Sequence, residues 1–233
     1  MSEQGYVPGA PAVARRPRRK RPIVIAVVAA CLVVAGVTWL VWPSARGPVP
    51  GTVQAGVLTL TEASELTGVT LASETGAAEP PPALAADPPN CAVAVGPATQ
   101  AVYGREWTSF LSRSYQDSET VSQHTVTQVL GVYPDGEKAR AVFRVLADGV
   151  KSCSSAVRTD GDQDTSSWNY QVTSAAADAM AWSATQESGD GWACHRQARL
   201  KGNTVLQVVV CQAGDGRPAA AKIADQVAGR VGA

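Results

Sequence analysis

Residues 192–211 read WACHRQARLKGNTVLQVVVC, two runs of residues on either side of Gly202-Asn203. A glycine at the first central position followed by asparagine is typical of a two-residue type II′ turn. The sequence therefore predicts an antiparallel hairpin of strands 192–201 and 204–211.

The register of this hairpin predicts a disulfide. Lys201 faces Thr204 across the turn, and counting outward brings Cys194 opposite Cys211. If the first pair is hydrogen-bonded, Cys194 and Cys211 form a non-hydrogen-bonded pair, in which the Cα atoms lie about 4.5 Å apart. This spacing is within the range of a disulfide, so we expect Cys194 to bridge Cys211.

Two further cysteines, Cys91 and Cys153, lie outside the apolar N-terminal segment. Because Cys194 and Cys211 are already paired, we expect these two to bridge each other. Their bridge closes a loop of about 60 residues and stabilises the fold by about 4 kcal/mol in a loop-entropy treatment. No two of the four cysteines are two to four residues apart, and the two histidines are distant in sequence from each other, so no zinc site is expected. We expect neither a metal nor a cofactor.

The pattern along the chain predicts an α+β fold with a twisted antiparallel sheet of about six strands and flanking helices. Aromatic and β-branched residues mark the strands, which are expected at 107–115, 121–133, 168–173, 179–187, 192–201 and 204–211. Five prolines in 72–90 predict a loop with no ladder hydrogen bonds there.

Helices are expected at four places. The clearest, 136–152, has an N-cap at Asp135 and an apolar stripe that extends to Cys153; its members are Ala139, Val142, Phe143, Leu146 and Val150. A second helix covers 218–231. Short helices are predicted at 61–66, with Thr61 as N-cap and Gly68 as its end, and from Asn90 as a cap to Tyr103 with a break at Gly96-Pro97.

Residues 23–42 carry no charge and follow six basic residues at positions 15–21. As a helix they would cross the roughly 30 Å hydrocarbon core of a membrane, with the basic flank in the cytoplasm. We expect a cytoplasmic tail (1–22), a transmembrane helix (23–42), a linker (43–56) and an extracytoplasmic domain (57–233). The alternatives are a cleaved signal peptide and a lipoprotein signal ending at Cys31.

The formal charge of the expected extracytoplasmic part restricts the kind of partner that it can bind. The chain has 20 basic and 20 acidic residues, of which six basic residues and one acidic residue precede position 23, so the rest has a formal charge of −5. This balance argues against nucleic acid as a partner. The Ala- and Val-rich composition is typical of actinobacteria.

Several motifs resemble the PknH-like extracellular sensor domains of mycobacterial serine/threonine kinases. The resemblance extends over about residues 57–233. The motifs that carry it are Asn90-Cys91-Ala92, Ala101-Val102-Tyr103-Gly104 with Trp107, Gly191-Trp192-Ala193-Cys194-His195-Arg196, Cys211, and Ile223-Ala224-Asp225-Gln226-Val227. The resemblance implies two disulfides and a large cleft for an unidentified envelope ligand. No Gly-rich phosphate loop or His-Arg-Asp motif is present, so we expect a module without kinase activity.

The best candidates for ligand contact are aromatic and polar side chains near the predicted sheet. Trp168 and Tyr170 project from one face of their strand, Trp182 lies on the next strand, and Gln171 and His124 are polar neighbours. Apolar rings with a few polar groups are typical of small-molecule pockets. The alternative is that the rings belong to the core and that His124 is a half-exposed residue of the sheet.

The sequence motifs do not support a catalytic site or a calcium-binding site. The sequence has no Gly-x-Ser-x-Gly motif, and alternation places His195 on the opposite strand face from Cys194. The segment 160–171 has acids at positions one, three and five of a calcium loop but lacks the glycine at six and the glutamate at twelve. We therefore expect a membrane-anchored, non-catalytic sensor or ligand-binding protein; the alternative is an envelope scaffold that binds another protein.

Overall fold

The predicted hairpin lies in the middle of the sheet. In the computed structural model, which describes residues 52–160 and 163–231, β8 (Trp192–Lys201) and β9 (Thr204–Ala213) pair with Cys194 opposite Cys211. The two sulfur atoms are bonded, and the Cα atoms lie 4.0 Å apart. Gly202 has φ +56°, as the first position of a type II′ turn requires. The register and the bridge are confirmed.

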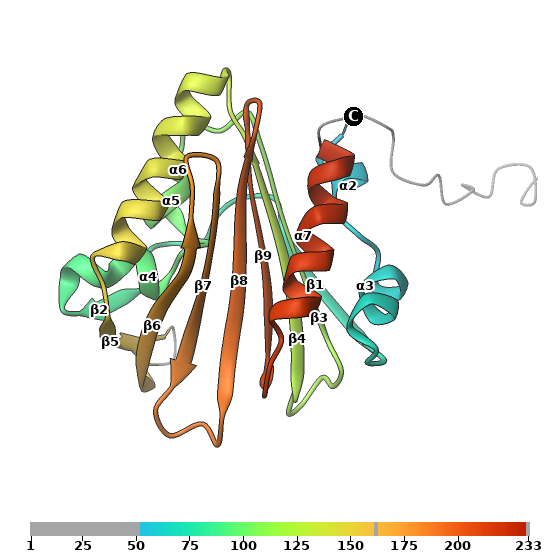
Figure 1. Ribbon diagram of the computed structural model, residues 1–233, viewed down its shortest axis with the longest axis vertical. Coiled ribbons are helices and arrows are strands. Elements are labelled where there is room, and N and C mark those ends of the chain that lie inside the picture. The colour runs from blue at the N-terminus through green and yellow to red at the C-terminus, as the bar shows by residue number, and fades with distance from the viewer. Residues whose placement is uncertain (1–51, 161–162, 232–233) are drawn as a thin grey trace, which may run out of the picture. The chain divides into compact units, whose positions relative to one another are not determined.

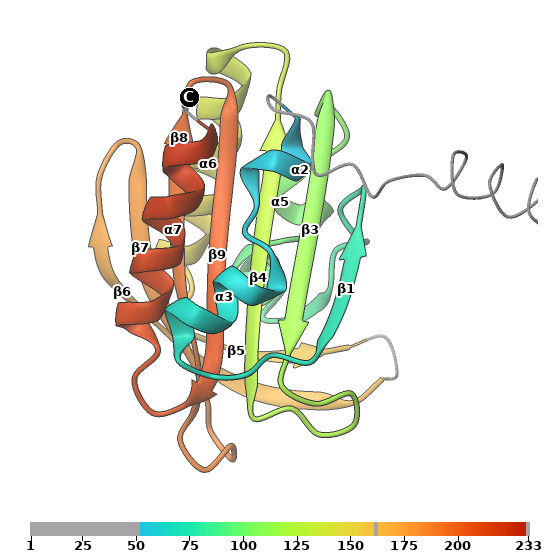
Figure 2. The ribbon, with the colours of Figure 1, turned by 90° about the vertical axis from the view of Figure 1, so that its right-hand side faces the viewer.

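The sheet is antiparallel and has nine strands in the part of the chain that the structure describes, in the order β1-β3-β4-β9-β8-β7-β6-β5-β2 (Figures 1 and 2). Beside β8 and β9, four predicted strands are present: β3 (Ser109–Gln116), β4 (His124–Val132), β6 (Thr165–Ala175) and β7 (Ala179–Gln186). Three strands were not predicted: β1 (Ser73–Ala77), β2 (Ala85–Asp87) and β5 (Ser155–Thr159). The α+β class is confirmed, and the number six is wrong.

The prediction of a loop without ladder hydrogen bonds over 72–90 is wrong for two short stretches. β1 pairs with β3, and β2 pairs with β5. Neither strand contains a proline, since the prolines lie between and after them. Both are edge strands, where an adjacent proline removes no hydrogen bond from the ladder.

Helices cover both faces of the sheet (Figure 1). One face carries η1 (Pro89–Cys91), α4 (Ala92–Val95), α5 (Gln100–Tyr103) and α6 (Gly136–Lys151); the other carries α2 (Val53–Gly56), α3 (Leu60–Thr67) and α7 (Arg217–Val231). Each layer closes its own apolar core. Because side chains alternate along a strand, Val205 of β9 belongs to the core under α6 and Leu206 to the core under α7.

Helix α6 follows its predicted pattern. Four of the five predicted stripe residues are buried, and Val142 packs partly buried against the same core. Asp135 caps the helix by accepting the Lys138 N–H at 2.8 Å. Cys153, just after the helix, is bonded to Cys91, which confirms the second bridge.

Helix α4 packs closely on α6. A Cβ on Gly149 would lie 2.5 Å from Val93, so glycine is required at that contact. The Cys91–Cys153 bridge joins the same two segments. Together these contacts hold α4 in place above the sheet.

Two predicted helix caps are wrong. Helix α3 begins at Leu60, and its cap is Thr59 rather than Thr61, because Thr59 and Glu62 form a reciprocal capping box. Gly68 ends this helix with φ +72°, as predicted. At η1 the cap position is Pro88, without a side-chain hydrogen bond, so Asn90 is not a cap.

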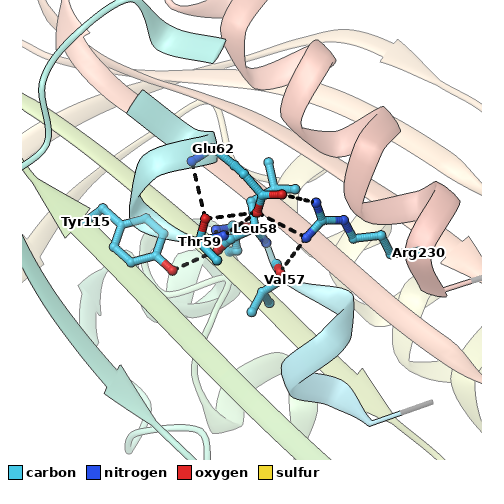
Figure 3. Close-up of polar contacts among 7 residues, drawn as sticks. Val57, Leu58, Thr59, Glu62, Tyr115 and Arg230 are labelled. Carbon is cyan, nitrogen blue, oxygen red and sulfur yellow. Dashed lines mark hydrogen bonds and ion pairs between the residues drawn. The ribbon is translucent and has the colours of Figure 1, made fainter. Parts of the chain in front are cut away.

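The N-terminal part of the domain is bound to the sheet by a buried polar network (Figure 3). The Gln128 side chain accepts the Leu58 N–H at 2.7 Å and donates to the Leu58 carbonyl at 3.1 Å, and the Tyr115 hydroxyl donates to the same carbonyl at 2.8 Å. Helix α2 lies in the stretch predicted as linker, and Val53 packs against the core under α7. The folded domain therefore begins before residue 57.

Arg230 joins this segment to the end of α7 (Figure 3). Its guanidinium donates to the Val57 carbonyl at 3.0 Å and to the Glu62 carboxylate at 2.6 Å. The hydrogen bond from Arg230 is the main cause that lowers the pKa of Glu62 to about 2, against the opposite effect of burial.

None of the helices within 52–160 and 163–231 is long and apolar enough to cross a membrane. The predicted cytoplasmic tail and transmembrane helix, 1–22 and 23–42, lie outside these residues.

The Glu62–Arg230 pair predicts a pH dependence of stability. Because the pKa of Glu62 falls from 4.5 in the unfolded chain to about 2 in the folded one, its contribution is present above pH 4.5 and is lost as pH falls toward 2. In Glu62→Gln the free energy of unfolding should therefore change less steeply between pH 4.5 and 2, measured by urea unfolding of the full chain in detergent. Glu65→Gln on the same helix is the control, and equal slopes in wild type and Glu62→Gln would contradict the prediction.

Candidate functional site

Two of the predicted site residues, Trp168 and Tyr170, lie side by side on β6 and line a small pocket. The pocket is enclosed by Ala94 and Val95 of α4 and by Ala184 on β7, beneath the helical layer that contains α6. Its remaining lining residues are Arg158, Cys194 and Arg196.

The pocket suits a small group. Its volume is about 30 Å³, more than the roughly 10–15 Å³ that one water needs. Pockets for drug-sized molecules measure roughly 300–1,000 Å³. A second pocket of about 170 Å³ shares Trp168 as a lining residue and extends along β5 and β6.

The register explains how Arg196 reaches this pocket. It follows Cys194 by two positions on β8, so both side chains lie on the same face of the sheet. The Nε atom of Arg196 is fully buried and has no hydrogen-bond partner in the part of the chain that the structure describes. Burial is the main cause that lowers the pKa of Arg196 to about 10; Tyr170 raises this pKa, and the charge of Arg158 lowers it.

The groups around Arg196 are cationic or neutral. Arg158 lies on β5, two positions after Ala156, which pairs with Trp168. Burial raises the pKa of Tyr170, against the opposite effect of the Arg196 and Arg158 charges, so its hydroxyl is protonated at neutral pH. The Arg196 guanidinium remains charged at neutral pH, since its pKa stays near 10. The pocket therefore holds two positive charges and a hydroxyl.

A buried amide fixes the chain above the pocket. Gln207 of β9 donates to the Pro97 carbonyl at 2.7 Å and to the Tyr103 hydroxyl at 3.0 Å. Both acceptors belong to the segment that follows α4. With the Cys91–Cys153 bridge on its other side, α4 is held from both ends.

The other three predicted site residues lie elsewhere. Trp182 is 2% exposed and belongs to the core under α6. Gln171 is exposed, and alternation places it on the opposite face of β6 from Tyr170. His124, on the face of β4 that also presents Val126 to the core under α7, bonds the Asp117 carboxylate at 2.9 Å.

Sequence reasoning missed Arg158 and Arg196. Arg196 was visible as part of the Gly-Trp-Ala-Cys-His-Arg motif, and its distance of two residues from Cys194 was sufficient to place it on the bridged face. Arg158 belongs to the unpredicted strand β5, so nothing placed it near Trp168. The lack of a carboxylate partner is a tertiary property that the sequence does not show.

Larger pockets are present, but their charged residues are neutralised or solvated. In a pocket of about 320 Å³ near α2, Arg230 is paired with Glu62. In another of about 260 Å³ near α5, Lys138 is paired with Glu106, and Arg105 is exposed. The pocket at Trp168 is therefore the better candidate for a binding site.

Within 52–160 and 163–231 no group of three His, Cys, Asp or Glu side chains is arranged to hold a metal. Two residues of the acidic segment, Gly161 and Asp162, lie outside those ranges.

His195 lies on the opposite face from Cys194, as predicted, and its Nε2 lies 3.1 Å from the Gly214 carbonyl oxygen.

Comparison with known proteins identifies the family. The family model described as the PknH-like extracellular domain matches residues 48–230. The chain belongs to this family. The match begins close to the start of the folded part, before the predicted boundary at residue 57.

Individual relatives agree with this assignment. The serine/threonine-protein kinases PknH of Mycobacterium bovis and of Mycobacterium tuberculosis are each 31% identical over 112 residues, which cover 45% of this chain. These residues are 18% and 17% of the two kinases, so the chain spans less than a fifth of the curated relatives. The crystal structure of the extracellular domain of PknH from Mycobacterium tuberculosis has the same fold, with a TM-score of 0.68 and 22% identity, over 81% of this chain and 98% of that one.

The buried Nε of Arg196, which has no hydrogen-bond partner among the described residues, predicts that this side chain reduces stability in the absence of a ligand. Replacing buried charge by an apolar side chain of similar length is often stabilising, so Arg196→Met should raise the free energy of unfolding by about 1 kcal/mol. The measurement is urea unfolding of the full chain in a chloride buffer. Arg144→Met, on the exposed surface of α6, should change it by less than about 0.5 kcal/mol. A loss of stability in Arg196→Met would show that the guanidinium has a stabilising partner.

Proposed function

We propose that this protein is a membrane-anchored sensor whose extracytoplasmic domain binds an envelope ligand at the pocket lined by Trp168 and Tyr170. Residues 23–42 supply the anchor, and the tail 1–22 stays in the cytoplasm. The domain acts by binding and not by catalysis. Its ligand is a small molecule or part of a larger envelope component.

The observation that carries this proposal is the pocket itself, in a chain of the PknH-like extracellular domain family. Its walls combine aromatic rings with polar groups, which is typical of ligand sites. Two disulfides constrain its surroundings: Cys91–Cys153 links the segment before α4 to the segment before β5, and Cys194–Cys211 links β8, which lines the pocket, to β9. A site held rigidly before binding loses little conformational entropy when the ligand enters.

The scaffold alternative lacks a matching surface in the described residues. A protein-binding face is expected to show a contiguous apolar patch. The exposed large apolar side chains, Val121, Val145, Val157 and Val172, come from four different segments: the loop before β4, α6, β5 and β6. The small-molecule proposal therefore has the stronger support.

The test is native mass spectrometry of the full chain, purified in mild detergent from an actinobacterial host. We expect an added mass of small-molecule size on the wild type and its loss in Trp168→Ala, because this change removes a wall of the pocket. Trp107→Ala is the matched control: Trp107 is also a partly enclosed ring, but it packs against Phe110 away from the pocket.

An unmodified mass in the wild type, or a mass shift equal to a second polypeptide, would contradict the proposal. Retention of the adduct in Trp168→Ala would place the ligand at another site.

A further inference from the structure

The arginines of the described part of the chain fall into distinct groups. Four are paired with carboxylates: Arg113 with Glu74, Arg199 with Asp225, Arg217 with Asp215 and Arg230 with Glu62. Three others are exposed to solvent: Arg105, Arg140 and Arg144. Arg158 and Arg196 differ from both groups, because they are partly buried, line one pocket and form no ion pair with a described residue.

Placing Arg158 and Arg196 in one pocket is energetically unfavourable without an anionic partner. The buried Nε of Arg196 donates no hydrogen bond to another described residue, and a buried donor without an acceptor destabilises a fold. The positive charge of Arg158 also acts unfavourably on Arg196, and the neutral Tyr170 hydroxyl carries no charge to offset it. An anion between the two arginines would supply both the missing acceptor and the missing negative charge.

We propose that the pocket binds an oxyanion, a phosphate, sulfate or carboxylate group of the ligand, between the guanidiniums of Arg158 and Arg196. This assignment rests on the proposed function, since it names the chemistry of the ligand at that same pocket. Guanidinium groups match such anions because their N–H groups donate in a planar fork to two oxygens. The Tyr170 hydroxyl supplies a further donor on the same face.

The size of the pocket restricts which part of a ligand can enter it. A pocket of about 30 Å³ accepts the anionic group alone. The pocket of about 170 Å³ is lined by Asp87, Glu187, Ser155 and Ser167; the register places Asp87, Ser155 and Ser167 on the opposite face of the sheet from Trp168, so this pocket does not continue the arginine pocket.

The test is isothermal titration calorimetry of the full chain in nonionic detergent, at ionic strength held constant with potassium chloride. The probes are inorganic phosphate and glycerophosphoglycerol, the water-soluble headgroup of phosphatidylglycerol. We expect saturable binding by the wild type, with the dissociation constant raised at least tenfold in Arg196→Gln and in Arg158→Gln. Arg144→Gln, which removes the same charge from the exposed face of α6, should bind like the wild type.

The two probes identify the source of the oxyanion. Tighter binding of glycerophosphoglycerol assigns it to a lipid headgroup, and tighter binding of phosphate assigns it to a free anion or a monoester. Absence of binding by both probes, or equal binding in all variants, would overturn the proposal. Thermal unfolding of each variant shows whether it is folded, so loss of binding is not confused with loss of structure.

Failure of this inference can be distinguished from failure of the proposed function. If the native mass spectrum of the double variant Arg158→Gln/Arg196→Gln keeps the wild-type adduct, the oxyanion assignment is wrong and the sensor proposal remains. If the wild type itself has no adduct and binds neither probe, both are wrong.

Discussion

The register of the β8–β9 hairpin is the constraint on which the rest of the structure depends. The turn at Gly202 and the Cys194–Cys211 bridge hold the two central strands from both ends. A slip of one residue would exchange the two faces of each strand. Arg196 would then leave the pocket face, and His195 would enter it. The same register supplies both cores with their apolar side chains.

The two faces of the sheet differ in function: the side covered by α7 contributes to stability, and the side covered by α4 and α6 contains the proposed binding pocket. On the face of α7, Gln128 bonds Leu58 and Arg230 is paired with Glu62. On the opposite face, α4 is held over the sheet by a disulfide and by the Gln207 amide. The cationic pocket lies beneath that helix. Destabilising features are expected where binding requires them, and here they lie beneath α4.

The elements that could be predicted from the sequence are those whose patterns lie within a short stretch of the chain. Turn chemistry and strand alternation were sufficient for the hairpin register and its bridge, and helical periodicity was sufficient for α6 and its Asp135 cap. Strands β1, β2 and β5 were missed because three to five residues at or near a sheet edge carry no strong pattern. Alternation also brought Trp168 and Tyr170 together correctly. The role of Arg196 depends on which carboxylates lie nearby in space, and that information is not local.

The most direct test of the central claim is anomalous diffraction at the selenium edge from crystals soaked in selenate, a tetrahedral oxyanion. We expect a selenium peak within hydrogen-bond distance of the Arg158 and Arg196 guanidiniums. That peak should disappear in crystals of Arg196→Gln. Selenium peaks only beside exposed arginines such as Arg140 and Arg144, with an empty pocket at Trp168, would contradict it.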